Sequence, residues 1–217
     1  MSRIEVTPGV EPFGDRAVLV TCAGMTERIR VAAELRERLP GLLVRSGMRT
    51  VLVEQPEPDP ALPERVTSAL AAAKAATRVE LGRTSSIVIP VAYEGQDLVE
   101  VSALLGLTVV DLVAAHVAQT WRVAMMGFAP GFGYLVPDGP QQAEWSAVPR
   151  RATPRAAVPA GSVAVSAGMS AVYPAAMPGG WHLIGRTDVR LFDPGNPGRP
   201  TLLDEGVVVR FVDGSSS

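Results

Sequence analysis

Residues 156–185 read AAVPAGSVAVSAGMSAVYPAAMPGGWHLIG, a stretch in which no side chain carries a formal charge. Three prolines interrupt it and leucine is almost absent, so it does not describe a membrane-spanning helix. Its β-branched and apolar runs, separated by glycine- and proline-rich turns, predict short strands at 161–166, 171–173 and 182–185. Many short strands joined by tight turns are typical of a closed β-barrel.

The rest of the second half fits the same architecture. Further strands are predicted at 86–93, 121–128, 189–192 and 207–212. Between the first two of these strands we expect a helix at 97–105 and another that begins at Thr108. Thr108 with Asp111 makes a Thr-x-x-Asp capping box, which marks the start of the second helix. We therefore assign residues 84–217 to a β-barrel domain.

The first part of the chain has a different pattern. It predicts a strand at 16–22, a helix from Thr26 to Leu39 capped by Thr26, strands at 42–45 and 50–54, and a helix at 61–76. The order β-α-β-β-α is that of a small α+β sandwich of the ferredoxin-like kind. Because the composition changes after Arg83, we assign this domain to residues 1–83.

Charge and cysteine content exclude several classes of protein. Charged residues make up 19% of the 217 positions and the net charge is −2, so we expect neither a general nucleic-acid binder nor a membrane-surface protein. Cys22 is the only cysteine, which rules out an intrachain disulfide and fits a reducing cytoplasm. No set of residues has metal-ligand spacing, and the N-terminus lacks a secretion-signal pattern. We expect a cytoplasmic protein without a bound metal.

Residues 127–135, GFAPGFGYL, follow directly on a predicted strand. Glycines allow positive φ and close approach of a neighbour, and proline fixes its own φ, so the aromatic side chains stand on a rigid bend. The stretch is either a barrel corner with its rings turned inward or a cleft loop facing a ligand or partner. The cleft-loop candidates are Phe128, Pro130, Gly131, Phe132 and Tyr134.

Residues 148–162, VPRRATPRAAVPAGS, place three arginines among prolines. Arginine forks bind carboxylates and phosphates through two hydrogen bonds, and prolines keep the backbone extended. Arg150, Arg151 and Arg155 are therefore candidate anion-binding residues. A structural or interface role is the alternative for each of them.

A further candidate anion site lies at 179–187, GGWHLIGRT. Consecutive glycines let backbone N–H groups face an anion, Trp181 offers an apolar platform, and Arg186 supplies a cation. His182 and His116, the only histidines, are candidate acid/base groups, and a hydrogen-bonded structural role is the alternative for each. The other candidates here are Gly179, Gly180, Ser170 and Tyr173.

At these residues the chain resembles the family of the B-type subunit of 5-oxoprolinase, also called allophanate hydrolase subunit 1 or KipI-like. The resemblance rests on GFAPGFGYL, on PRRATPRAAVPAGSV at 149–163, and on YPAAMPGGWHLIGRTDVRLFD at 173–193. It covers nearly the whole chain. The family usually has proline at Gly133, serine at Met177, and Gly-Gly-Gln-Thr-Gly at 167–171. These departures bear on the substrate more than on the fold.

The resemblance implies an α+β protein, with a ferredoxin-like N-terminal domain followed by a cyclophilin-like β-barrel. It implies a subunit of an ATP-dependent 5-oxoprolinase that opens 5-oxo-L-proline to L-glutamate. ATP with Mg²⁺ would be needed, together with a second subunit similar to the C-type subunit of 5-oxoprolinase or to allophanate hydrolase subunit 2, and the isolated chain would be inactive. Anions would be bound by Arg150, Arg151, Arg155 and Arg186, and protons transferred by His116 or His182. We expect the loop 127–135 and the uncharged segment 156–185 to line a cleft closed by the second subunit, and Arg155→Ala to cut turnover while leaving the fold intact.

Two other functions remain open at this level. One is a carboxyltransferase module of a biotin-dependent urea or amide carboxylase, with biotin as its cofactor. The other is a KipI-like binding module that inhibits a sensor histidine kinase without turnover. Biotin dependence would indicate the first, and kinase binding the second.

Overall fold

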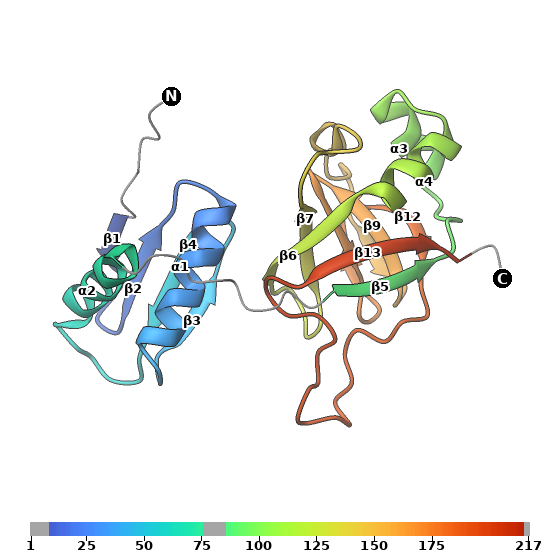
Figure 1. The fold of residues 1–217 in the computed structure, drawn as a ribbon. Helices are drawn as coiled ribbons and strands as arrows, with labels where there is room; N and C mark the ends of the chain where they lie inside the picture. The colour runs from blue at the N-terminus through green and yellow to red at the C-terminus, as the bar shows by residue number, and fades with distance from the viewer. Residues whose placement is uncertain (1–8, 76–85, 215–217) are drawn as a thin grey trace, which may run out of the picture. The chain divides into compact units, whose positions relative to one another are not determined.

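The computed structural model describes residues 9–75 and 86–214 (Figure 1). The chain divides into two compact units, residues 1–83 and 84–217, and each unit has hydrophobic core clusters of its own. The boundary after Arg83, the last position of the predicted helix at 61–76 and the C-terminal end of the predicted barrel domain lie outside the described residues.

The first unit is a four-stranded antiparallel sheet with two helices. Its elements are β1 (Gly9–Pro12), β2 (Ala17–Thr21), α1 (Met25–Arg38), β3 (Leu43–Ser46), β4 (Thr50–Glu54) and α2 (Leu62–Ala75). The strand order is β1-β2-β4-β3. Alternate valines of β2 and β4 are fully buried, and they pack against apolar residues of both helices, such as Leu35 and Val66. The predicted ferredoxin-like α+β unit is confirmed.

Two details of this unit differ from the prediction. The short strand β1 was not predicted; Val10 pairs with Val20, so β1 occupies the sheet edge where a βαββαβ unit places its fourth strand. Helix α1 begins at Met25 after Gly24, so the predicted cap at Thr26 is wrong. A carboxylate oxygen of Glu27 instead accepts a hydrogen bond from the Ala23 N–H at 2.6 Å.

The second unit contains a larger sheet that closes on itself. Its elements are β5 (Ser86–Val91), α3 (Leu98–Leu105), α4 (Val109–Ala118), β6 (Thr120–Met126), β7 (Gly133–Pro137), the 3₁₀ helix η1 (Trp145–Ala147), β8 (Arg155–Val158), β9 (Ser162–Ser166), β10 (Met169–Val172), β11 (Met177–Gly179), β12 (His182–Arg186) and β13 (Val208–Asp213). Seven strands follow the order β12-β9-β10-β7-β6-β13-β5, and β8 pairs with β11. Figure 1 shows β13 lying beside β5, with which it is parallel.

The two edges of the seven-stranded sheet meet at Ala92 and Arg186. The backbone N–H groups of these residues donate to each other's carbonyls at 2.8 and 2.9 Å. This contact closes the sheet into a nearly complete, cyclophilin-like barrel, as predicted. Across the sheet, residues on neighbouring strands form the interior row His182–Val165–Ser170–Leu135–Val123, in which two polar residues stand among core aliphatics.

Helices α3 and α4 follow β5 and pack on the barrel (Figure 1). The Thr108 hydroxyl accepts from the Asp111 N–H at 3.1 Å and donates to the Asp111 carboxylate at 2.7 Å, which confirms Thr108 as the helix cap and its pairing with Asp111. Within the described ranges, no single helix is long and apolar enough to cross a membrane. The α3–α4 pair reaches the required length and composition only as two helices that meet at 83°.

The barrel also departs from the sequence prediction in several strands. The predicted strand at 189–192 is wrong: Phe192 makes only an isolated bridge with Thr201, while Leu191 is buried in the core without a strand ladder. The strands β7, β8 and β11 were not predicted. Glycine and proline dominate their surroundings, and their pairing depends on neighbouring strands more than on local β-propensity.

His116 of α4 is a polar residue in the barrel core. Its Nδ1 lies 2.8 Å from the Tyr93 hydroxyl and its Nε2 lies 3.1 Å from the Ser170 hydroxyl. The imidazole stacks on Phe211 at a centroid distance of 4.5 Å and packs beside Trp121. Burial lowers the pKa of His116 from 6.5 to about 3 because the charged form loses its hydration. The imidazole is therefore neutral at physiological pH, as in a structural histidine.

We predict that protonation of His116 destabilises the protein in acid. The unfolded chain, with a His116 pKa near 6.5, binds the extra proton more readily than the folded chain. The stabilising contribution is therefore complete above about pH 6.5 and is lost as the pH falls toward 3. Between pH 7 and pH 5 the His116 contribution should fall by about 2 kcal/mol.

Urea unfolding followed by tryptophan fluorescence measures this effect, because all three tryptophans lie in the barrel unit. His116→Gln removes the titrating group and is expected to be less stable at pH 7. From pH 7 to pH 5 this variant should lose about 2 kcal/mol less than the native protein does. Equal losses in the two proteins would contradict the prediction.

Candidate functional site

The stretch GFAPGFGYL forms a tight turn between β6 and β7. The Ala129 N–H donates to the Gly127 carbonyl at 2.8 Å, so Phe128, with φ +69°, is the central residue of a three-residue γ-turn. Phenylalanine rarely adopts a positive φ, and such strain costs about 1–3 kcal/mol. The Phe128 side chain is 61% exposed. The strained turn therefore holds one aromatic ring outward.

The two residues after Ala129 complete the turn. Pro130 is exposed, whereas Gly131 is buried with φ +81°. A Cβ atom on Gly131 would lie 2.8 Å from the Cβ of Phe192 and 2.9 Å from the Leu191 carbonyl oxygen. Only glycine satisfies both constraints, so this position locks the turn against the 191–192 segment.

The aromatic cluster consists of Phe132 and the rings around it, which meet it edge to face. The centroid of Phe132 lies 5.3 Å from Phe128, 5.0 Å from Tyr134, 5.4 Å from Tyr173 and 6.1 Å from Trp181. Phe132, Tyr173 and Trp181 are buried within this chain, and Tyr134 is half-buried. The inward-turned alternative therefore describes most of the cluster. These three rings are shielded from water by this chain itself. The expected cleft closed by a second subunit therefore does not need to include them.

Asp97, directly before α3, is the centre of a buried charge cluster. Its carboxylate oxygens accept from Nη2 of Arg155 at 2.7 and 2.9 Å, from Nη1 of Arg151 at 3.1 Å and from the Leu183 N–H at 2.7 Å. Asp97 is only 4% exposed. Both arginines thus donate to a carboxylate of the same chain, Arg155 through Nη2 and Arg151 through Nη1. This carboxylate offsets the charge that the sequence predicted for an external anion, although Nε of Arg151 is buried without a hydrogen-bond partner among the described residues.

Glu100, on the first turn of α3, extends this cluster to His182. One Glu100 oxygen lies 3.3 Å from Nη1 of Arg151, and the other lies 3.4 Å from Nε2 of His182. The His182 side chain is 2% exposed, and its buried Nδ1 has no hydrogen-bond partner among the described residues. His182 therefore has one ring nitrogen that is not engaged by its surroundings.

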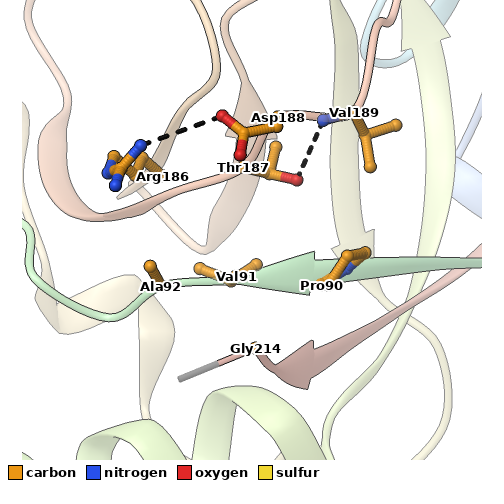
Figure 2. Close-up of a pocket in the computed structure, with 8 residues that line it drawn as sticks. All are labelled: Pro90, Val91, Ala92, Arg186, Thr187, Asp188, Val189 and Gly214. Atoms are coloured by element: carbon orange, nitrogen blue, oxygen red, sulfur yellow. Dashed lines mark hydrogen bonds and ion pairs between the residues drawn. The ribbon is translucent and has the colours of Figure 1, made fainter. Parts of the chain in front are cut away.

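Arg186 lies apart from the other predicted arginines. It is largely exposed and forms ion pairs with Glu94 and, at 3.8 Å, with Asp188. Glu94 raises its pKa further above the ordinary value. Figure 2 shows Arg186 at a groove of about 370 Å³ whose other lining residues are Pro90, Val91, Ala92, Thr187, Asp188, Val189 and Gly214. This groove contains none of the other predicted site residues.

Arg150 is the predicted arginine that faces the aromatic cluster. Its Nη2 lies 3.5 Å from the position that a Cβ on Gly180 would take, and the Tyr173 hydroxyl lies where a Cβ on Gly179 would be, at 2.3 Å. Burial raises the pKa of Tyr173 and of Tyr134, and the positive charge of Arg150 opposes both shifts. The double glycine thus makes room for a guanidinium and a phenol on adjacent residues.

The predicted site residues therefore divide into separate groups. Those that share the aromatic face are Arg150, Tyr173, Gly179, Gly180, Trp181, Phe128, Phe132 and Tyr134. Those around the acidic pair are Arg151, Arg155 and His182, while His116 and Ser170 lie in the core and Arg186 lies at its own groove. Sequence reasoning missed Asp97 and Glu100: Asp97 entered only as the first residue of the predicted helix at 97–105, and Glu100 was not singled out. The signal that the sequence offered was the negative charge of these two residues, which could pair with the positive charges of the arginine-rich segment.

The Asp97–Arg155 pair changes the expectation for Arg155→Ala. Removing the guanidinium leaves a buried carboxylate without two of its four hydrogen bonds, and breaking a buried ion pair costs about 3–5 kcal/mol. We predict that Arg155→Ala and Asp97→Asn each lower the free energy of unfolding by amounts in this range, and that the double variant loses clearly less than the sum. Urea unfolding measures these values.

The exposed pair of Arg186 and Glu94 supplies the matched control, because exposed pairs contribute about 0–1 kcal/mol. Glu94→Gln should therefore leave stability almost unchanged. If Asp97→Asn were equally harmless, Asp97 would not be holding this part of the barrel together.

Residues 8–203 match the family described as carboxyltransferase domain, subdomain C and D. The B-type subunit of 5-oxoprolinase from Escherichia coli O157:H7 is 46% identical over 129 residues, which are 58% of this chain and 57% of that protein. The chain thus aligns with little more than half the length of this curated relative.

Solved structures show the same fold. A crystal structure of TTHA0988 has a TM-score of 0.71 at 31% identity and covers 93% of this chain and 40% of that chain. The urea amidolyase of Kluyveromyces lactis has a TM-score of 0.68 at 18% identity, covers 98% of this chain and 15% of that one, and shows likeness of fold alone. Because the family match extends over residues 8–203, this chain belongs to the family of the carboxyltransferase domain, subdomain C and D.

Proposed function

We propose that the chain is one subunit of an ATP-dependent 5-oxoprolinase that opens 5-oxo-L-proline to L-glutamate. The observation that supports this most strongly is the identity of 46% to the B-type subunit of 5-oxoprolinase from Escherichia coli. A protein named as a subunit implies a complex, and the chain covers only 40% of TTHA0988, so members of this fold also occur within longer chains. The proposed partner is a second subunit similar to the C-type subunit of 5-oxoprolinase or to allophanate hydrolase subunit 2.

The proposed reaction needs groups that hold anions near an apolar surface. The γ-phosphoryl group of ATP passes to the lactam oxygen and ADP is released. Water then adds to the activated carbon, and the ring C–N bond breaks to give the acyl phosphate of glutamate. A second water attacks this acyl phosphate and releases phosphate and glutamate. Every reactant is anionic apart from water, and fixed cations stabilise the charge that develops. The aromatic face with Arg150 has both properties: a wall of buried rings and an exposed guanidinium.

For proton transfer we retain His182 and set His116 aside. Both ring nitrogens of His116 are engaged in the core, whereas Nδ1 of His182 is not bonded to any described residue. Glu100 lies beside Nε2 of His182 at 3.4 Å. Because Nδ1 is buried in the barrel, it can exchange a proton only with a group that enters the interior beside His182.

Mg²⁺, which ATP chemistry commonly requires, finds no ready set of ligands in this chain. Among the described residues, no group of three or more His, Cys, Asp or Glu side chains is placed to hold a metal ion. The carboxylates of Asp97 and Glu100 are engaged by arginines and by His182. We therefore assign no residue of this chain to Mg²⁺ and derive no step from it.

We predict that the purified complex of both subunits releases ADP faster when 5-oxoproline is added, and forms glutamate in equal amount. ADP release is measured with a coupled assay and glutamate by chromatography. The isolated chain should show neither, because the proposed reaction requires the second subunit. The isolated subunits are the controls.

An intact complex that binds ATP but shows no response to 5-oxoproline would overturn the proposal. Turnover that depends on biotin and bicarbonate would then indicate the urea or amide carboxylase alternative. Tight binding to a sensor histidine kinase without turnover would indicate the KipI-like alternative.

A further inference from the structure

We propose that Arg150, together with the hydroxyl groups of Tyr173 and Tyr134, binds the carboxylate of the substrate. The inference rests on the proposed function, because it names the part of a cyclic amide acid that this face of the barrel recognises. It assigns one cation to the substrate and leaves the other predicted arginines with structural roles.

The first argument is that the other predicted anion-binding arginines are already engaged. Arg151 and Arg155 each donate through one nitrogen to the buried carboxylate of Asp97, and Arg186 pairs with Glu94 and Asp188. In the described part of the chain, Arg150 has no carboxylate partner, and its electrostatic neighbours are two tyrosines. An external anion therefore finds an uncompensated guanidinium at Arg150.

The second argument is that the backbone holds Arg150 in place. The N–H of its neighbour Arg151 donates to the Gly180 carbonyl at 2.8 Å, which ties the arginine segment to the double glycine. Arg151 then reaches Asp97, whereas Arg150 lies against Gly180 and Pro154. The side chains of these two adjacent arginines therefore lie in different surroundings: Arg151 contacts an internal carboxylate, and Arg150 lies at the aromatic face.

The third argument is that the Tyr173 hydroxyl lies at the double glycine. It is 2.3 Å from the position of a Cβ on Gly179, while Arg150 lies at Gly180, the next residue. A phenol has one proton that it can donate to a carboxylate. Half-buried Tyr134, which packs edge to face on Phe132, is a second phenol that lies near the charge of Arg150. A guanidinium with two phenols is a donor set for a carboxylate.

The aromatic cluster strengthens the hydrogen bonds that Arg150 and the two tyrosines donate, and it favours a substrate with a small ring. Trp181 and Phe132 are buried, so they lower the local polarity and strengthen a charge-assisted hydrogen bond beside them. The methylene groups of a five-membered lactam are apolar and match the part of the cluster that is not buried, the rings of Phe128 and half-buried Tyr134. Phe128, held outward by the strained turn, adds an exposed ring at the border of the same cluster.

The same donors would also suit a phosphate group of the nucleotide. A carboxylate is favoured because the phenols are neutral and the wall is aromatic, whereas triphosphate sites commonly use glycine-rich loops at helix N-termini. The test therefore measures the substrate and the nucleotide separately.

The experiment compares the native complex with Arg150→Gln and Tyr173→Phe. Arg150→Gln should raise KM for 5-oxoproline roughly 10- to 100-fold, as expected for loss of a charged hydrogen bond, and leave KM for ATP within about twofold. Tyr173→Phe should raise KM for 5-oxoproline roughly 3- to 10-fold. Arg190→Gln, which removes an exposed arginine paired with Asp193, is the matched control and should behave as the native complex does.

The second arm replaces the substrate with 2-pyrrolidinone, the same lactam without its carboxylate. In the native complex, kcat/KM should fall when 5-oxoproline is replaced by 2-pyrrolidinone. In Arg150→Gln, kcat/KM for 5-oxoproline is already low and should fall only slightly further on the same replacement, because the interacting pair is already broken. Calorimetric titration of both lactams, with a non-hydrolysable ATP analogue present, gives the same comparison without turnover.

The outcomes separate this inference from the proposed function. Suppose that 5-oxoproline is turned over and that its replacement by 2-pyrrolidinone lowers kcat/KM by the same factor in Arg150→Gln as in the native complex. The inference is then wrong and the function stands. If KM for ATP rises instead, the arginine binds phosphate and the inference is overturned. If 5-oxoproline binds through Arg150 without being opened, the site stands and the proposed activity fails.

Discussion

The carboxylate of Asp97 is the interaction on which the rest of the site depends. It joins three segments that are far apart in the sequence: the start of α3, the arginine segment at 151–155, and β12 through the Leu183 N–H. A buried carboxylate is tolerated only when it is fully paired, so each of these segments is fixed by the others. The polar cluster thereby sets where the double glycine and the aromatic face lie.

The aromatic face follows from this arrangement. Arg151, bound to Asp97 and through its backbone to Gly180, leaves Arg150 beside Tyr173 and Tyr134. Gly179 must lack a side chain because the Tyr173 hydroxyl takes that space. Phe132 then joins the phenols to Trp181 and Phe128. Three features therefore place the cation of Arg150 on the aromatic face. They are the ion pair of Arg151 with Asp97, the hydrogen bond from the Arg151 N–H to the Gly180 carbonyl, and the absence of a side chain at Gly179.

Much of the fold could be predicted from the sequence because local patterns specified it. The barrel strands at 161–166 and 182–185 and the Thr108 cap have strong local signals, and the structure confirms them. The strand predicted at 189–192 is wrong because apolar residues there pack into the core without a pairing partner. Whether a segment pairs in a sheet depends on the strands beside it, so β8 and β11 could not be predicted from their own sequence either.

The site was less predictable for a related reason. The arginines, glycines and aromatics were identified as candidates, but their roles depend on which charges meet in space. Asp97 lies 54 and 58 positions from Arg151 and Arg155, and this long-range pairing has no local signal. The sequence could therefore not distinguish an arginine that is neutralised internally from one that faces a ligand.

A crystal structure of the complex of both subunits with 5-oxoproline and a non-hydrolysable ATP analogue tests this account most directly. The account predicts the substrate carboxylate within hydrogen-bond distance of Arg150 and Tyr173, with Arg151 and Arg155 still paired to Asp97. A carboxylate held by Arg155 or Arg151, with Asp97 released from them, would contradict it.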